Sequence, residues 1–309
     1  MPAQDFEWSD LRFFLAVARA GKLTLAARQM GVEHSTVSRR IATLERTLGT
    51  QLFDRQPAGY VLTPAAERLM ASAEAMEAMA AAAQQDIGGA DLGVSGTVRI
   101  GAPDGFGTFF LAPRIGALAG LHPALEIQLL AMPRLYSLSK READIAISLS
   151  RPKEGRLHAR KLADYRLQLY AARDYVAAHG PLDSRPGLQR HPFVSYIDDL
   201  IYAPELDYVP QVGKDLRPRL KSSSLVAQMM MIRSGAGIGI LPCFMGNTDP
   251  ALCPVLEEEV SLTRSFWLVT HADMRALARV KAAADFIVRL AQEGRALLHP
   301  PGDGARVRP

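Results

Sequence analysis

The sequence predicts an α/β protein in two parts, with a small helical unit and a long linker helix preceding a larger α/β region. Residues 9–48 place apolar side chains at the three- and four-residue spacing of helices. From residue 95 onward, short apolar strand candidates alternate with helix-length segments, as in α/β domains. At 309 residues with 48% hydrophobic side chains, the chain is long enough for more than one compact core.

The composition excludes several classes of protein. Cys243 and Cys253 lack the paired spacing of a metal site and are typical of a reduced intracellular protein. The first ten residues lack the features of a signal peptide, and no apolar run reaches the roughly 18 residues of a membrane span. We therefore expect a cytoplasmic protein with no metal and no membrane contact. The net charge of +4 permits a polyanionic partner, and basic residues concentrate between Arg19 and Arg46.

Two short helices are predicted at the start of the chain. Ser9 is a candidate N-cap for the first helix, and Gly21 ends it. A second helix follows from Thr24, where the small side chain of Ala26 lets another helix approach closely. Gly31 then supplies the tight turn of a helix-turn-helix.

A third helix is predicted from Glu33. Its apolar residues form one narrow stripe, and the opposite side carries polar and cationic residues: Ser35, Thr36, Ser38, Arg39, Thr43 and Arg46. Such a face suits the major groove of DNA, where arginine pairs bidentately with guanine and hydroxyls at the helix start bind phosphate oxygens. A solvated amphipathic helix has the same pattern and remains an alternative.

The segment "LFDRQPAGYVLT" predicts a hairpin directly after this helix. Two short strands flank the turn residues Pro57, Ala58 and Gly59, and Arg55 lies at the edge of the hairpin. A hairpin after a helix-turn-helix forms a wing. The first 63 residues are therefore expected to form a winged helix-turn-helix that binds double-stranded DNA.

The segment from Trp8 to Pro64 resembles the winged helix-turn-helix of LysR-type transcriptional regulators. The resemblance is carried by "LAARQMGVEHSTVSRRIATLERTLGTQLFDR" and "GYVLTPA". It implies DNA contacts from the helix start and the wing, at His34, Ser35, Thr36, Ser38, Arg39 and Arg55. Members commonly have Ser and Gln where this chain has Glu33 and His34, so base preference at these positions does not carry over. His34 is equally compatible with a role at the helix start, bonding a neighbouring carbonyl.

Residues 64–92 are expected to form a linker helix and a hinge. Thr63 and Pro64 make an N-cap and first-turn pair, and apolar residues recur along one side at helical spacing. Pairing with a second copy would bury that side, and the resemblance implies the same dimer contact, with homodimer or homotetramer open. Gly88, Gly89 and Gly93 mark the domain boundary.

The region from residue 93 to 295 predicts an α/β domain with mainly parallel strands. Its strand candidates are "TVRIGAP", "EIQLLAM", "DIAISLS", "LQLYAA", "HPFVSYI", "GIGILP" and "SFWLVTH". Ligands of such sheets settle at the carboxyl ends of strands, near helix N-termini. Those ends include the residues from Pro103 to Gly107, Ser148, Ser195, Tyr196 and the run from Ser222 to Ser224.

The α/β region also resembles, more loosely, the effector-binding domain of the same regulators. The resemblance rests on "GTVRIGAP", "ADIAISL" and "SSSLVAQMMMIRSGAGIGILP". It implies a two-lobed fold like a periplasmic binding protein, with lobe I at about 93–166 and 270–295 and lobe II at about 167–269. We expect the chain to cross between lobes near 166–169 and near 269–271, and residues 296–309 to form a flexible tail.

A small-molecule effector is expected in the cleft between these lobes. Its candidate contacts are Gly105, Phe106, Ser148, Ser195, Tyr196, Ser223 and Ser224. The serine run is equally compatible with a plain helix N-cap. A helix start favours a small organic anion, whereas Asp104 opposes one, so the effector's charge stays open.

Catalytic motifs are missing from the sequence. The chain has no G-x-S-x-G, H-E-x-x-H or G-x-x-x-x-G-K motif, and "GAGIGI" lacks the last glycine of a dinucleotide fingerprint. We therefore expect no cofactor and no enzymatic activity. The competing hypothesis is an α/β ligand-binding or catalytic protein whose winged helix makes only protein contacts.

Overall fold

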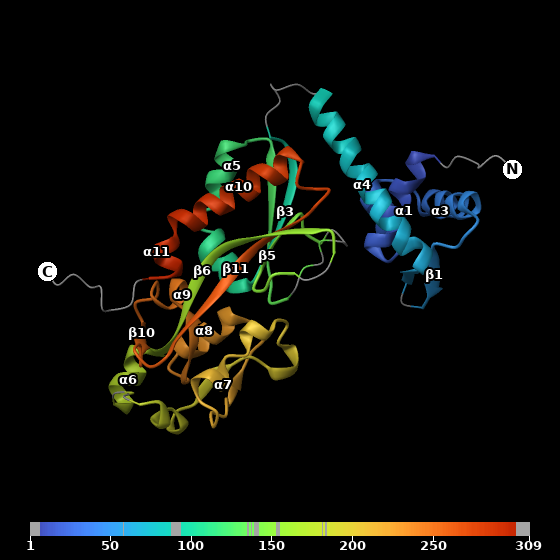
Figure 1. The fold of residues 1–309 in the computed structure, drawn as a ribbon. Helices are drawn as coiled ribbons and strands as arrows, with labels where there is room; N and C mark the ends of the chain where they lie inside the picture. Colours follow the sequence, from blue (N-terminus) through green and yellow to red (C-terminus); the bar gives the residue numbers. More distant parts are fainter. Residues whose placement is uncertain are drawn as a thin grey trace. The chain divides into compact units, whose positions relative to one another are not determined.

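The computed structural model describes residues 7–57, 59–87, 94–134, 136, 138, 142–152, 155–180, 182 and 184–300. Contacts within the chain divide it into two compact units, 1–92 and 93–309, which are coloured along the sequence in Figure 1. Within the described residues, no helix is both long enough and apolar enough to cross a membrane.

The smaller unit is a winged helix-turn-helix followed by a long helix. Its elements are α1 (Trp8–Ala20), α2 (Leu23–Met30), α3 (His34–Leu48), β1 (Phe53–Gln56), β2 (Gly59–Leu62) and α4 (Pro64–Ile87). Helices α1, α2 and α3 each end at a glycine with a φ of 65° or 66°, a left-handed conformation that glycine adopts without strain. Strands β1 and β2 pair in antiparallel register, with Phe53 opposite Leu62.

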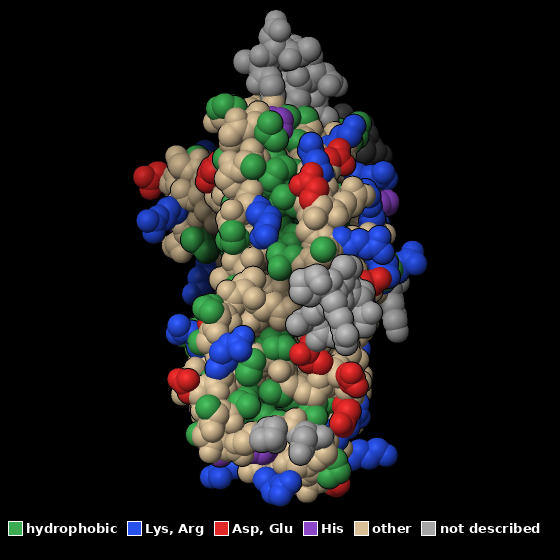
Figure 2. Space-filling model, turned by 90° about the vertical axis from the view of Figure 1, so that its left-hand side faces the viewer, with side chains coloured by type: hydrophobic (Ala, Val, Ile, Leu, Met, Phe, Trp, Pro, Cys, Tyr) green, Lys and Arg blue, Asp and Glu red, His purple; other side chains and the backbone are tan. Residues whose placement is uncertain are grey.

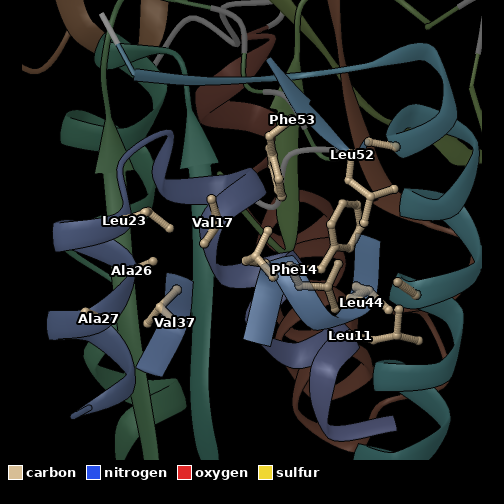
Figure 3. Close-up of a cluster of buried hydrophobic side chains, with 14 residues drawn as sticks. Leu11, Phe14, Val17, Leu23, Ala26, Ala27, Val37, Leu44, Leu52 and Phe53 are labelled. Carbon is tan, nitrogen blue, oxygen red and sulfur yellow. The ribbon is translucent and has the colours of Figure 1, made fainter. Parts of the chain in front are cut away.

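The core of this unit joins all three of its short helices to the wing. Figure 3 shows Phe14 of α1, Val37 and Leu44 of α3, and Leu52 and Phe53 at the start of the wing converging on it. Phe14, Val37 and Leu44 have no exposed surface, and the Phe14 and Phe53 rings lie 5.5 Å apart. Helix α3 and the wing are therefore held by one shared core.

The first half of α4 belongs to this core as well. Ala66 and Ala73 are fully buried in it, and Leu69 and Met70 pack against it. In this first half, the apolar side that we expected a second copy to cover is therefore buried within the chain itself, and that expectation is wrong there. Farther along, Met76 is 41% exposed and Met79 is 72% exposed.

One of the helix caps predicted from the sequence is present in the structure, and another is not. The Thr63 Oγ1 accepts a hydrogen bond from the Ala66 backbone N–H at 3.3 Å, which confirms the predicted cap of α4. The predicted cap at Ser9 is wrong, because α1 begins one residue earlier, at Trp8. The Ser9 hydroxyl instead donates to the Glu7 carboxylate at 3.1 Å.

The larger unit is built on one mixed sheet in the order β4-β3-β5-β11-β6-β9-β7-β8, with β10 also paired to β6. Its strands are β3 (Gly96–Ala102), β4 (Leu125–Ala131), β5 (Ile145–Ser148), β6 (Leu157–Ala172), β7 (Phe193–Ser195), β8 (Leu220–Lys221), β9 (Ile238–Pro242), β10 (Leu252–Val255) and β11 (Ser261–His271). Strands β3, β4 and β5 are parallel, as are β7, β8 and β9. We call the first set lobe I and the second set, with β10, lobe II.

The long strands β6 and β11 connect the two lobes. They pair with each other in antiparallel register from Leu157 opposite His271 to Gln168 opposite Ser261, and Figure 1 shows them side by side. Their outer segments pair with β5 in lobe I and with β9 in lobe II. Because Val269 already pairs with Ala146 of β5, β11 enters lobe I before the expected crossing at 269–271.

Helices and turns cover this sheet. They are a π-helical turn (Phe106–Leu111), α5 (Gly116–Leu121), α6 (Arg173–His179), α7 (Val209–Val212), α8 (Leu225–Arg233), α9 (Cys243–Gly246), α10 (Ala278–Glu293), α11 (Arg295–Leu298) and 3₁₀ turns at Arg185–Arg190, Asp198–Leu200 and Pro204–Leu206. Leu298 of α11 is fully buried, so the expected flexible tail at 296–309 does not begin at 296, and residues 301–309 lie outside the described part. The expected glycine hinge at 88, 89 and 93 also lies outside it.

The surface of the protein carries charges of both signs. On the face seen in Figure 2, Lys and Arg side chains are interspersed with Asp and Glu side chains and with apolar groups. Such mixing is typical of a solvated surface and differs from the single-sign surface that binds a polyanion.

Candidate DNA-binding surface and effector site

Helix α3 has one buried side and one exposed side. Val37, Ile41 and Leu44 are at most 4% exposed and fix the helix in the core. The predicted contacts lie on the other side, with His34, Ser35 and Arg39 exposed and Thr36 and Ser38 half-buried. No described side chain caps the start of α3. The Thr36 N–H donates to the Glu33 carbonyl at 3.0 Å, which leaves the His34 and Ser35 N–H groups to an external acceptor.

Two adjacent arginines on α3 have different environments. The Arg40 guanidinium lies 3.0 Å from Asp10 Oδ1 and 3.5 Å from Glu7 Oε2. Asp10 is only 3% exposed, so Arg40 holds α3 against α1. The Arg39 side chain makes no hydrogen bond or ion pair with any described residue. Its guanidinium therefore remains free for a partner outside the chain.

The wing is tied to α3 by a residue that the sequence argument did not identify. The Glu45 Oε1 accepts hydrogen bonds from the Leu52 N–H at 2.8 Å and the Phe53 N–H at 3.3 Å. Arg55 is exposed on β1, and its guanidinium carbon lies 5.8 Å from the centre of the Tyr60 ring on β2. Glu45 thus sets where the wing begins, and the wing presents Arg55.

An inner cavity lies where lobe I and lobe II meet. The segment directly after β3 supplies Pro103, Asp104, Gly105 and Phe106, and the remaining lining includes Tyr165, Tyr196, Tyr202, Tyr208, Leu225, Phe244 and Phe266. Aromatic rings fill much of the space, with Phe106 and Phe266 centred 4.3 Å apart. The free volume is about 20 Å³, which is room for about one water molecule.

Glycine at position 105 follows from the close approach of the lobes. A Cβ there would lie 2.7 Å from the Met245 sulfur and 3.0 Å from Leu225 Cδ2, both in lobe II. A hydroxyl side chain at this position would displace one of them. At position 105 the chain therefore presents only backbone atoms, beside the buried ring of Phe106.

Asp104 connects the lobes by hydrogen bonds. Its Oδ2 accepts from the Ser224 hydroxyl at 2.8 Å and from the Val226 backbone N–H at 3.4 Å. The Ser224 Oγ also accepts from the Ala227 N–H at 3.2 Å, which makes Ser224 the N-cap of α8. Of the three serines, Ser224 is therefore the cap of α8, and its hydroxyl also donates to Asp104.

An outer cavity of about 220 Å³ adjoins the inner one. The two share Pro103, Leu149 and Tyr202 as walls. Ser148 and Arg134 line only the outer cavity, and most of its other lining is apolar.

The other predicted effector contacts are distributed unevenly. Gly105, Phe106 and Tyr196 line the inner cavity, and Ser148 lines the outer one. Ser195 lies in a separate hollow with Asp198 and Lys221, and Ser223 lines neither cavity. Sequence reasoning did not identify Tyr165, Tyr202 and Tyr208, which come from segments without a motif.

The tyrosine hydroxyls of the inner cavity are neutral. Burial raises the pKa of Tyr165, Tyr196, Tyr202 and Tyr208 well above the ordinary tyrosine range. Each hydroxyl can therefore both donate and accept a hydrogen bond. No group of three or more His, Cys, Asp or Glu side chains suited to a metal ion occurs among the described residues.

Both units match models of known domains. Residues 8–67 match the model described as a bacterial regulatory helix-turn-helix protein of the lysR family, and residues 92–292 match the LysR substrate binding domain. The chain belongs to the LysR family. It is a DNA-binding transcriptional regulator whose second domain binds an effector.

Individual LysR relatives resemble the chain over nearly its whole length. The Mau operon transcriptional activator of Paracoccus denitrificans is 28% identical over 87% of this chain and 90% of its own length. The regulator CrgA of Neisseria meningitidis serogroup C is 27% identical over 90% of this chain and 95% of its own. A full-length OxyR variant from Pseudomonas aeruginosa has the same fold, with a TM-score of 0.70 at 20% identity, covering 92% of this chain and 98% of that one.

Proposed function

We propose that this LysR-type regulator reads double-stranded DNA with α3 and the wing of two copies, and that a small molecule in the two adjoining cavities alters that binding. The observation that carries the DNA half is the contrast on α3. Arg40 is committed to Asp10, whereas Arg39 is exposed and has no partner among the described residues.

Each predicted contact receives a role from its environment. Arg39 lies one turn into α3 and suits a guanine edge in the major groove. Ser35, Thr36 and the uncapped N–H groups at the helix start suit phosphate oxygens. His34 is exposed at the helix start and Ser38 is half-buried beside Arg39, and Arg55 on the wing suits the neighbouring backbone.

Self-association is proposed through the exposed part of α4. Met79 is 72% exposed and Met76 is 41% exposed, which is a large apolar surface for a helix in water. A second copy of α4 would cover both and bring two recognition helices to one duplex. Operators should then be two-fold symmetric, with half-sites spaced by helical turns. Dimer and tetramer both satisfy this proposal.

Selection from a random duplex library tests the DNA half. The full-length protein should enrich two-fold symmetric sites, and its affinity for them should fall steeply as salt rises, because bound counterions are released. Enrichment of no sequence, with a shallow salt dependence, would favour the alternative in which the winged helix makes only protein contacts.

Sedimentation of Met79→Lys tests the association. The charge would have to be buried in the shared surface, so the variant should dissociate at concentrations where the parent is associated. Glu67→Lys is the control, because Glu67 is also exposed on α4 but lies on a different side of the helix from Met79. Equal dissociation of both variants, or of neither, would place the contact elsewhere.

A further inference from the structure

The inner cavity has a single charged group in its lining. Asp104 is 6% exposed, and no Lys, Arg or His is among the described residues that line this cavity. Only its Oδ2 is engaged by the chain, through Ser224 and Val226. The second oxygen, Oδ1, accepts no hydrogen bond from any described residue. A carboxylate oxygen with no described partner, in a largely buried residue, favours a ligand that supplies a proton or a positive charge.

Asp104 also occupies the position where an anionic ligand would be expected. The first N–H groups of a helix and its dipole attract negative charge. At α8 this role is already filled, since the Asp104 carboxylate accepts from the Val226 N–H and from the Ser224 cap. A ligand carboxylate placed there would have to displace Asp104 or lie beside it, and like charges at such distances repel strongly.

The rest of the inner cavity is suited to a cation. Four tyrosines and three phenylalanines contribute to its lining, and the faces of such rings attract positive charge. Tyr208 is 2% exposed, and its hydroxyl lies near the Tyr196 hydroxyl. The Tyr208 hydroxyl nevertheless makes no hydrogen bond of normal geometry with a described residue. It is a second polar atom in the same lining without a described hydrogen-bond partner, besides Asp104 Oδ1.

The outer cavity supplies the volume that the inner one lacks. Its 220 Å³ is lined mainly by apolar side chains, and it shares Leu149 and Tyr202 with the inner cavity. Arg134 also lines it, but its guanidinium is 3.3 Å from the Glu142 carboxylate and lies over the Tyr136 ring. Among the described residues that line the outer cavity, Arg134 is therefore the one cation, and it is already paired.

We propose that the effector is an organic cation, a small amine or ammonium compound with an apolar body, whose nitrogen binds Asp104 while the body lies in the outer cavity. This inference rests on the proposed effector function and specifies the ligand class for it. Asp104 is the residue that selects against carboxylates, which reverses the anion preference expected from the helix start alone.

The hydrogen bond between Asp104 and Ser224 also connects ligand binding to the conformation of the domain. Asp104 follows β3 in lobe I, and its partner Ser224 caps α8 in lobe II. A cation on Oδ1 adds a contact to a carboxylate that bonds across the two lobes, so its binding is linked to how the lobes meet.

Matched ligands that differ only in the head group test the proposal. The full-length protein is heated with benzylamine, benzyl alcohol or benzoate, and with butylamine, butanol or butyrate. Stabilisation should follow the order amine, alcohol, carboxylate, because a ligand that binds only the folded state raises the melting temperature. Calorimetric titration of the amine should give an affinity at least tenfold above that of the matching carboxylate.

Asp104→Asn separates charge from structure. The amide oxygen can still accept from Ser224 and Val226, so the fold should persist, while the negative charge is gone. Amine affinity should fall at least tenfold and carboxylate affinity should rise. Asp174→Asn is the matched control, since Asp174 is exposed in the first turn of α6, and it should bind every probe like the parent.

Each contrary outcome has a distinct meaning. Carboxylates that stabilise the parent as well as amines would overturn the ligand class but leave effector regulation standing. Amine binding unchanged in Asp104→Asn would move the cation site elsewhere. If no probe binds while the protein still binds its selected duplex, the organic-cation inference fails and the DNA function does not.

Discussion

The recognition helix and the inner cavity hold their polar groups in opposite environments. On α3, Arg39 is exposed and free of described partners, whereas in the cavity Asp104 is nearly buried and bonded to Ser224. An exposed cation can meet a polyanion without first breaking a contact, but a buried carboxylate can offer a ligand only its remaining oxygen. Substitutions of exposed α3 side chains such as Arg39 should therefore change binding alone, while substitutions in the cavity should also change stability.

Phe106→Ala should show the largest loss of stability. The Phe106 ring is 1% exposed and centred 4.3 Å from Phe266 and 4.9 Å from Phe110. Removing it leaves a cavity that its neighbours cannot fill, at a cost of roughly 3–5 kcal/mol in the free energy of unfolding. Urea denaturation of the full chain, followed by circular dichroism, measures this.

The control for that substitution is Leu200→Ala, because Leu200 is 50% exposed. It should change the unfolding free energy by less than about 1 kcal/mol. If Phe106→Ala is as mild as the control, the aromatic cluster is loosely packed and Phe106 is available to ligands. The contrast between a tightly packed cavity and an exposed side of α3 would then not hold.

The sequence predicted the parts whose signals are local. The stripe of Val37, Ile41 and Leu44 identified the buried side of α3 because helical spacing is visible within one segment. The caps at Thr63 and Ser224 were visible for the same reason. The cap at Ser9 failed because several residues near a helix start can compete for the role, and here the helix begins at Trp8.

The cavity was less predictable because its walls come from distant segments. Asp104 and Ser224 meet across 120 positions of sequence, and strand-end reasoning named both segments without showing that they bond. Tyr165, Tyr202 and Tyr208 belong to no motif, so only the fold reveals that they face one space. Likewise, the adjacent Arg39 and Arg40 are chemically identical in the sequence, and only the position of Asp10 separates them.

Arg40→Ala should destabilise the smaller unit. It leaves the Asp10 carboxylate, which is 3% exposed, without its guanidinium partner at 3.0 Å. The expected cost is roughly 1–3 kcal/mol, the usual penalty for a buried polar group that loses its partner. Thermal unfolding monitored by circular dichroism measures it. Asp10→Asn combined with Arg40→Ala should recover part of the loss, and no recovery would show that the pair does not act as a unit.

Arg39→Ala should leave stability within about 0.5 kcal/mol of the parent, because the side chain is exposed and has no described partner. Its effect should appear in DNA binding, as a loss of roughly 1–3 kcal/mol concentrated at one base pair of each half-site. Fluorescence anisotropy on duplexes with single base changes measures this. Arg68→Ala removes a charge from an exposed position on α4 and serves as the control. An equal loss on every duplex would make Arg39 a phosphate contact instead.

The smallest effect is expected at His191 of lobe II, which is far in sequence from α3 and from Asp104. Burial, with smaller contributions from His179 and Arg190, lowers the pKa of His191 below its ordinary value of 6.5.

In the folded state the His191 Nδ1 lies 2.9 Å from the Tyr175 hydroxyl, and a neutral ring can accept that proton. The folded protein therefore binds fewer protons than the unfolded chain just below pH 6.5, so the His191 contribution to stability is complete above that pH and declines as pH falls toward the folded pKa. Urea midpoints measured at about pH 7.5 and about pH 5.5 should differ less in His191→Gln than in the parent. Arg190→Gln should reduce the difference by a smaller amount, because it removes only one of the three causes. A pH dependence that is identical in the parent and in His191→Gln would assign the acid sensitivity of this lobe to other groups.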